Sequence, residues 1–90
     1  MVAVRIPPTL RAEVGGAREI GASGDTVAAV IDDIVDRFPA LGSQLLEDGE
    51  LAPFVNVYVS GEDIRTRDGV ETPVADGAQV ILLPAMAGGC

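Results

Sequence analysis

The stretch Asp76-Gly77-Ala78-Gln79-Val80-Ile81-Leu82-Leu83-Pro84-Ala85-Met86-Ala87-Gly88-Gly89 decides the fold that this sequence predicts. Asp76-Gly77 is a tight-turn signal. Residues 79–83, which are all apolar from Val80 onward, predict a final strand that stops at Pro84. The small, uncharged residues after Pro84 predict a flexible tail. Gly88 and Gly89 have no Cβ, so they can thread a channel too narrow for other residues. A frayed end without a function is the open alternative.

Length and composition predict one domain with a buried core, because the 90 residues include 48% hydrophobic side chains. We expect the domain to span 1–84 and the tail to span 85–90. No stretch approaches the ~20 apolar residues of a membrane span, and the N-terminus lacks an export signal. We therefore expect a cytoplasmic protein without a membrane partner. A net charge of −8 argues against nucleic acid and favours a basic groove on a protein partner.

The supply of reactive side chains argues against an enzyme. The chain has no histidine, and Cys90 is its single cysteine, so a Ser-His-Asp triad, a Cys-His pair and an internal disulfide are excluded. A zinc site with the usual nitrogen and sulfur ligands is excluded too. Asp32 and Asp33 are neighbours in a helical pattern, where their side chains diverge. We expect no catalytic residue, no metal site and no bound cofactor, and therefore a carrier or binding module.

The first half of the chain predicts a hairpin followed by a helix. Alternating apolar residues predict a strand over 2–6, and a weaker strand over 17–22 is expected to pair with it across a long loop. Apolar residues spaced three and four apart predict the main helix, about 26–38, with Thr26 as its N-cap and Pro39 ending it. Three acids on this helix are expected to form its solvated face: Asp32, Asp33 and Asp36.

The second half predicts mostly strands. Residues 41–46 suggest a short second helical turn that closes at Asp48-Gly49, and β-branched residues predict a strand over 54–59 with its valines facing the helix. Residues 64–66 are expected to form a very short strand, while 70–74 fit either an edge strand or a loop. This order predicts an α+β fold, a ubiquitin-like β-grasp. We expect a mixed sheet of four to five strands, with the first and last strands central and parallel and the helix across one face.

Strand alternation also predicts a docking face. Val80 and Leu82 are expected to face the helix, which leaves Ile81 and Leu83 on the open face of the sheet. An apolar docking patch for a partner is then expected, formed by Phe54, Tyr58, Ile81, Leu83 and Met86. The alternative is that some of these residues complete the core or are exposed singly.

The chain resembles the ubiquitin-like sulfur carrier proteins of the MoaD/ThiS family over nearly its full length. The resemblance rests on the helix entry Gly24-Asp25-Thr26-Val27 and on the closing run of Asp-Gly turn, apolar strand, proline and Gly88-Gly89. Ala78 departs from the family, which often has a second Asp there. Within the family, the chain is most similar to the CysO-type carriers of actinobacterial cysteine biosynthesis. Their shared stretches include Ile6-Pro7, Gly15-Gly16, Ser23-Gly24-Asp25-Thr26, 54–59 and 83–89.

The resemblance implies a mechanism centred on Gly89. An ATP-dependent adenylyl/sulfurtransferase, related to ubiquitin-activating enzymes, would adenylate the Gly89 carboxylate, and sulfur would replace AMP to leave a thiocarboxylate. A pyridoxal-phosphate-dependent cysteine synthase working on O-phosphoserine would take the sulfur. An S-to-N acyl shift would leave cysteine amide-linked to Gly89, and a JAMM-type zinc peptidase would release it. Docking surfaces and an unhindered terminus are the carrier's part, while ATP is used by the activating partner.

Cys90 departs from the family pattern because it places Gly89 in a peptide bond. It is interpreted as an encoded extension that a peptidase trims, as a cloning or ligation residue, or as a cysteine adduct. Other functions remain open: the small subunit of molybdopterin synthase, a carrier for thiamine or a sulfur-containing secondary metabolite, and a ubiquitin-like protein modifier. A structural domain with a frayed tail is a further alternative.

Overall fold

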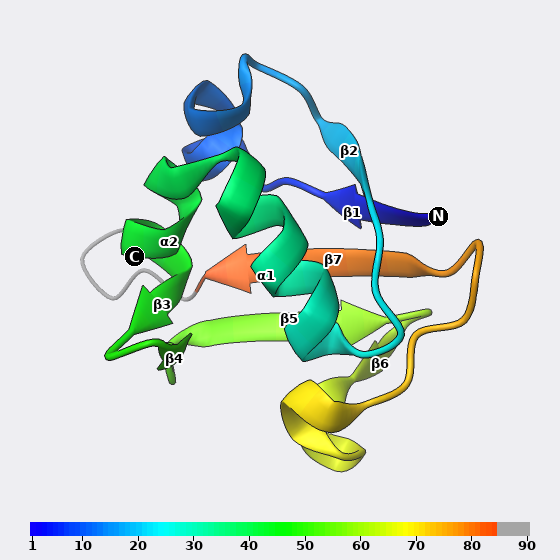
Figure 1. The fold of residues 1–90 in the computed structure, drawn as a ribbon. Helices are drawn as coiled ribbons and strands as arrows, with labels where there is room; N and C mark the ends of the chain where they lie inside the picture. The colour runs from blue at the N-terminus through cyan, green and yellow to red at the C-terminus, as the bar shows by residue number, and fades with distance from the viewer. Residues whose placement is uncertain (85–90) are drawn as a thin grey trace.

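The computed structural model describes residues 1–84 of the chain. Within this range, five strands form one mixed sheet in the order β2-β1-β7-β5-β6, with the helices over one face (Figure 1). The parallel neighbours β1 and β7 lie inside the sheet, as predicted for a β-grasp. The strands of this sheet are β1 (Val2–Arg5), β2 (Glu19–Ala22), β5 (Val55–Val59), β6 (Glu62–Asp63) and β7 (Gln79–Pro84).

The Asp76-Gly77 turn brings the starts of β1 and β7 together. Gly77 adopts a φ of 84°, which suits a residue without a Cβ, and its N–H donates to the carbonyl of Met1 at 3.0 Å. The terminal amine of Met1 donates to the Asp76 carboxylate, and this contact lowers the pKa of Asp76 below its ordinary value. With the two starts aligned, Val4 lies beside Val80 in the parallel ladder.

The main helix, α1 (Val27–Arg37), begins and ends where the sequence predicts. The Thr26 hydroxyl accepts from the N–H of Ala29 at 3.2 Å, satisfying one of the free donors of the first turn. A Cβ on Gly24 would lie 2.6 Å from the nitrogen of Val30 and 2.8 Å from the carbonyl carbon of Ala29. The chain can therefore pass this close to the helix only with glycine at position 24.

The segment after the 3-10 helix η3 (Gly69–Glu71) fixes the start of α1. Val27 donates to the carbonyl of Thr72 at 3.1 Å, and Val74 donates to the carbonyl of Asp25 at 2.8 Å. Thr72 is fully buried, and its hydroxyl donates to the carbonyl of Gly69 and accepts from the N–H of Asp68. Residues 70–74, which the sequence left open between strand and loop, thus form the end of η3 and an isolated bridge to the helix entry.

The core lies between α1 and the sheet. The three valines of β5 are at most 6% exposed, as are Val80 and Leu82 of β7, so the predicted alternation of both strands is confirmed. From the helix, the fully or almost fully buried residues are Val27, Val30, Ile31 and Ile34. Among the described helices, none combines the length and apolarity that a membrane crossing requires.

The expectation of a very short strand over 64–66 was wrong. Ile64–Thr66 is a 3-10 helix, η2, and the short strand β6 lies just before it. The physical reason is local: the Asp63 carboxylate accepts from the N–H of Arg65 at 2.9 Å and starts a turn. Ile64 is buried as a single anchor, with 3% of its surface exposed.

Two further features go beyond the sequence expectations. The predicted helical turn is α2 (Pro39–Leu45), and the chain then forms a small separate hairpin of β3 (Leu46–Glu47) and β4 (Glu50–Leu51). Its turn has positive φ at Asp48 (54°) and Gly49 (81°), the conformation that Asp-Gly hairpin turns favour. The loop between β1 and β2 contains the 3-10 helix η1 (Pro8–Val14), and β2 begins later than the predicted residue 17.

Candidate functional site

The candidate site is the strand that leads into the diglycine tail, together with the open sheet face around it. β7 is hydrogen-bonded to β1 on one side and to β5 on the other, and its last residue, Pro84, is paired with Val55. β1 pairs with β7 only as far as Ile81, and β5 alone continues the pairing up to Pro84, where the tail begins. Four predicted site residues lie outside the described residues: Met86, Gly88, Gly89 and Cys90.

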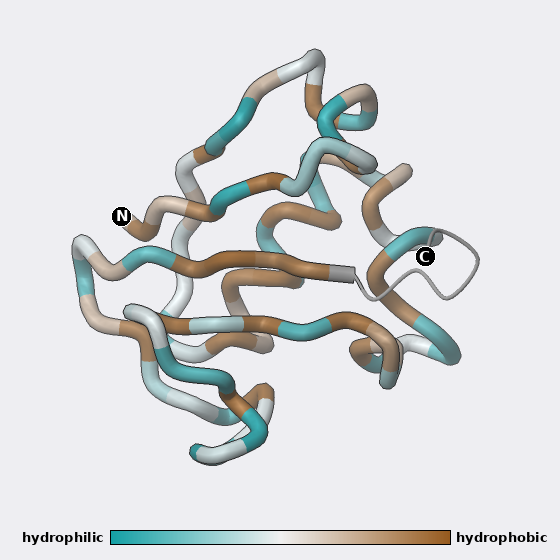
Figure 2. Tube along the Cα trace, turned by 180° about the vertical axis from the view of Figure 1, so that it is seen from behind, coloured by the Kyte–Doolittle hydropathy of each residue, from teal (hydrophilic) through white to brown (hydrophobic). Residues whose placement is uncertain are grey.

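The structure brings the other predicted docking residues to one region. Ile81 pairs with Tyr58 on β5, and both side chains are half-buried. Leu83 is 45% exposed two residues farther along β7, and Phe54, immediately before β5, is 41% exposed. Seen from the uncovered side in Figure 2, the apolar strand β7 runs without interruption toward the tail. We call Phe54, Tyr58, Ile81 and Leu83 the sheet-face patch.

Arg65 is a residue of this region that the sequence reasoning missed. Its guanidinium donates to the Asn56 side-chain oxygen and to the carbonyls of Pro53 and Val55. Asn56 in turn pairs with Leu83 in the ladder. Arg65 thus fixes the entry of β5 beside Phe54 and adds positive charge next to the patch. No spacing signal indicated it, because the contact depends on the η2 turn that the sequence did not predict.

The three helix acids are not equivalent. Asp32 and Asp36 are exposed, as expected for a solvated face. Asp33 is half-buried, pairs with Arg37 at 3.0 Å and accepts from the N–H of Ser23 at 3.0 Å. It therefore connects the helix to the chain that follows β2, which is a structural role.

The described residues supply surfaces and a fixed strand. Within residues 1–84, no group of three or more aspartates, glutamates, histidines or cysteines lies close enough to hold a metal ion. The lowered pKa of Asp76 belongs to the start of β7, at the opposite end of the strand from Pro84. This arrangement is suited to presenting the tail and to binding a partner protein around the end of β7, where the tail begins.

Comparisons with known proteins agree with this geometry. The ThiS family model matches residues 4–89. The sulfur carrier protein CysO of Mycobacterium tuberculosis is 44% identical over 91 residues, which cover 98% of each chain.

Solved structures agree as well. A chain of the crystal structure of the Amycolatopsis orientalis BexX/CysO complex superposes with a TM-score of 0.90 at 42% identity, covering 99% of this chain and all of that one. The small archaeal modifier protein 1 of Methanosarcina acetivorans superposes with a TM-score of 0.88 at 30% identity, covering 98% and 95%. The resemblance seen in the sequence is confirmed, and the chain belongs to the ThiS family of ubiquitin-like sulfur carrier proteins.

Proposed function

We propose that this chain carries sulfur as a thiocarboxylate at Gly89 and donates it to cysteine biosynthesis from O-phosphoserine. The observation that carries the proposal is the extent of the family match, which continues through β7 and includes Gly88 and Gly89. The 44% identity to a protein named sulfur carrier protein CysO supports the choice of pathway. The fold supports the proposal as well, because the pairing of β7 with β5 continues as far as Pro84 and fixes the strand up to the tail.

Activation requires a partner enzyme, and the carrier supplies the acyl group. An ATP-dependent adenylyl/sulfurtransferase joins AMP to the Gly89 carboxylate and releases pyrophosphate. Sulfur then attacks the acyl carbon, AMP leaves, and a thiocarboxylate results. In this proposal the carrier is not an enzyme and binds no cofactor, because ATP is consumed in the partner's active site. The sheet-face patch, with Met86, contacts that partner.

Sulfur donation uses the thiocarboxylate as a nucleophile. On a pyridoxal-phosphate-dependent cysteine synthase, its sulfur forms a bond to the carbon that loses phosphate from O-phosphoserine, giving a thioester. The neighbouring amine then attacks the thioester carbonyl, and the acyl group moves from sulfur to nitrogen. Cysteine is now amide-linked to Gly89, and hydrolysis by a JAMM-type zinc peptidase releases it and restores the carboxylate.

Cys90 gives this proposal a direct test. Because Cys90 follows Gly89, the Gly89 carbonyl is part of a peptide bond and cannot be adenylated until that bond is hydrolysed. The Gly89–Cys90 bond is chemically the same amide that the S-to-N shift produces, so one peptidase would serve both maturation and product release.

The experiment is to incubate the full chain with its JAMM-type peptidase and to follow the mass of the intact protein. We expect the loss of one cysteine residue, leaving a chain that ends at Gly89, and we expect the metal-free peptidase to leave the mass unchanged. A Cys90 form that persists with the active, zinc-loaded peptidase would show that this enzyme does not mature the carrier.

A ubiquitin-like protein modifier is the second candidate function. The specific observation in its favour is the similarity to the small archaeal modifier protein 1, at 30% identity over nearly the whole chain. Both functions begin with adenylation of Gly89 and differ in the acceptor. A carrier accumulates a free thiocarboxylate, whereas a modifier forms amide bonds to lysines of target proteins.

A further inference from the structure

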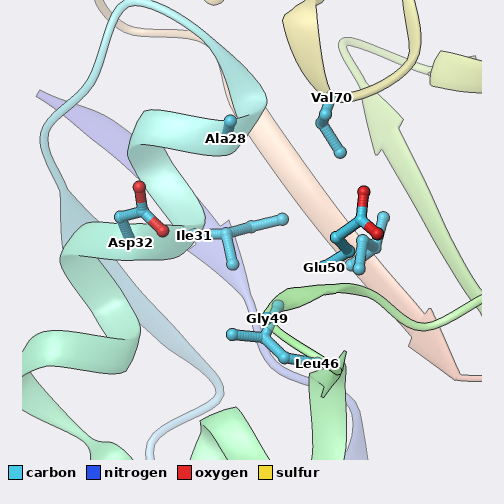
Figure 3. A pocket seen from close by; sticks show the side chains of 8 residues that line it. Ala28, Ile31, Asp32, Leu46, Gly49, Glu50 and Val70 are labelled. Carbon is cyan, nitrogen blue, oxygen red and sulfur yellow. The ribbon is translucent and has the colours of Figure 1, made fainter.

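A small apolar pocket opens on the helical side of the molecule, away from the sheet-face patch. It lies between α1, the β3–β4 hairpin and η3, as Figure 3 shows, and has a volume of about 130 Å³. Ile31, Leu46 and Val70 from these three elements point toward one another across it. The other lining residues are Ala28, Asp32, Gly49, Glu50 and Leu51.

The rim of the pocket is acidic. Asp32 of α1 and Glu50 of β4 lie on opposite sides of the apolar floor (Figure 3). Glu50 is also directly opposite Glu47 in the hairpin register, an arrangement of like charges that destabilises a strand pair. Among the described residues, no arginine forms a salt bridge with any of these three carboxylates. The rim therefore carries negative charge that a cationic ligand would neutralise.

We propose that this pocket is a second docking site, which receives one aliphatic side chain from a basic segment of a protein partner. The apolar floor would bury the side chain, and lysines or arginines on either side of it would meet Asp32 and Glu50. The charge complementarity also serves the encounter, because a chain of net charge −8 attracts basic segments from a distance.

Other occupants fit the pocket less well. Small-molecule sites usually enclose about 300–1,000 Å³, so a pocket of about 130 Å³ suits a single side chain better. A second copy of the chain would bring more negative charge to the rim, and an anionic membrane surface would be repelled by it. A basic segment with an apolar anchor is the occupant that matches both the floor and the rim.

The location of the pocket allows two partners at once. α1 covers one face of the sheet (Figure 1), and the sheet-face patch is formed by the residues of β5 and β7 that alternate with those buried under the helix. The pocket, which α1 lines, and the patch therefore face different sides. A partner held at the pocket would leave the base of the tail free for the enzyme that acts on it.

The test titrates the isotope-labelled full chain with two pentapeptides and follows its amide resonances by NMR. One peptide has a central leucine with two arginines on each side, and the other has glycine in place of leucine. We expect the leucine peptide to shift the amides of Ala28, Ile31, Leu46 and Val70 saturably. The glycine peptide should bind at least about fivefold more weakly, because it buries no aliphatic side chain.

Two variants locate the binding. Glu50→Gln should weaken the leucine peptide about threefold or more, while Glu19→Gln, which removes the same charge at β2, should not. Ala28→Leu fills the pocket and should abolish the leucine preference, while Ala40→Leu on the exposed surface of α2 should keep it. Thermal unfolding of each variant shows whether the fold is retained. Glu50→Gln removes the repulsion between Glu50 and Glu47, so we expect this variant to stay folded, and weaker peptide binding would then report the lost charge.

Three results would overturn the proposal. Equal affinity for the two peptides would reduce the interaction to general charge attraction. Shifts centred on Tyr58 and Ile81 would place the binding on the sheet-face patch. Concentration-dependent shifts of the pocket residues without peptide would identify a second copy of the chain as the occupant.

Discussion

Leu83 is the residue of the sheet-face patch that is both strongly exposed and next to the start of the tail. Its side chain is 45% exposed although it belongs to a strand whose alternate residues are almost fully buried. It lies one residue before Pro84, where the tail begins, and opposite Asn56, which Arg65 holds in place. A leucine that is both exposed and held in a fixed position can be covered by a partner protein without any rearrangement of the strand. Its place in the sheet-face patch is therefore consistent with a contact made in a complex.

Replacing Leu83 with aspartate should therefore weaken activation without unfolding the domain. We expect kcat/KM for adenylation of the Gly89-ended carrier to fall at least about tenfold, because a charge would be buried in an apolar contact. Ala40→Asp adds the same charge at an exposed position of α2 and should leave the rate unchanged. Pyrophosphate release measures the rate. Equal rates for the Leu83→Asp variant and the unchanged carrier would remove the sheet-face patch from the proposed function.

Single residues also show where prediction from the sequence stops. The inward and outward residues of β5 and β7 could be predicted, because strand alternation determines them. Arg65 could not, since its three acceptors come together only after η2 has turned the chain back toward β5. Asp33 likewise had the spacing of a solvated helix face, and its contact with Ser23 depends on the path of the chain after β2.

At the scale of elements, α1 depends on a segment more than forty residues away. Its first N–H group, from Val27, finds its partner in the carbonyl of Thr72, and Thr72 is fully buried. The helix itself was predictable because its apolar spacing is strong and both of its ends carry recognisable signals. The strand pair β3–β4 was not, because two-residue strands are too short to show periodicity.

Thr72→Val should lower the free energy of unfolding by about 1–3 kcal/mol, since the N–H of Asp68 and the carbonyl of Gly69 would each lose the buried Thr72 hydroxyl as a hydrogen-bond partner. Thr66→Val is the matched control. Its hydroxyl also donates to a backbone carbonyl, that of Asp63, but at an exposed position where water can replace it. Urea unfolding at neutral pH measures the free energy of unfolding of both variants. If the two variants lost the same stability, the buried network around Thr72 would not be what fixes the start of α1.

At the scale of the whole molecule, the two faces of the sheet have different roles. One face is covered by α1 (Figure 1) and buries the core, and the other presents the sheet-face patch beside the strand that leads to the tail. The β-grasp architecture was predictable from the order and type of the strong elements. The apolar pocket with the acidic rim was not predictable, because it is built from three elements of which two, η3 and the β3–β4 hairpin, were not predicted.

The proposed function depends above all on the conversion of Gly89 to a thiocarboxylate. The most direct measurement is the intact mass of the Gly89-ended chain after incubation with its adenylyl/sulfurtransferase, ATP and a sulfur donor. A chain that ends at Gly88 serves as the control. We expect a mass gain equal to the exchange of one oxygen for sulfur, dependent on ATP and absent from the control. An unchanged mass with an activating enzyme that thiolates a known carrier, or a chain found only in amide linkage to target lysines, would contradict it.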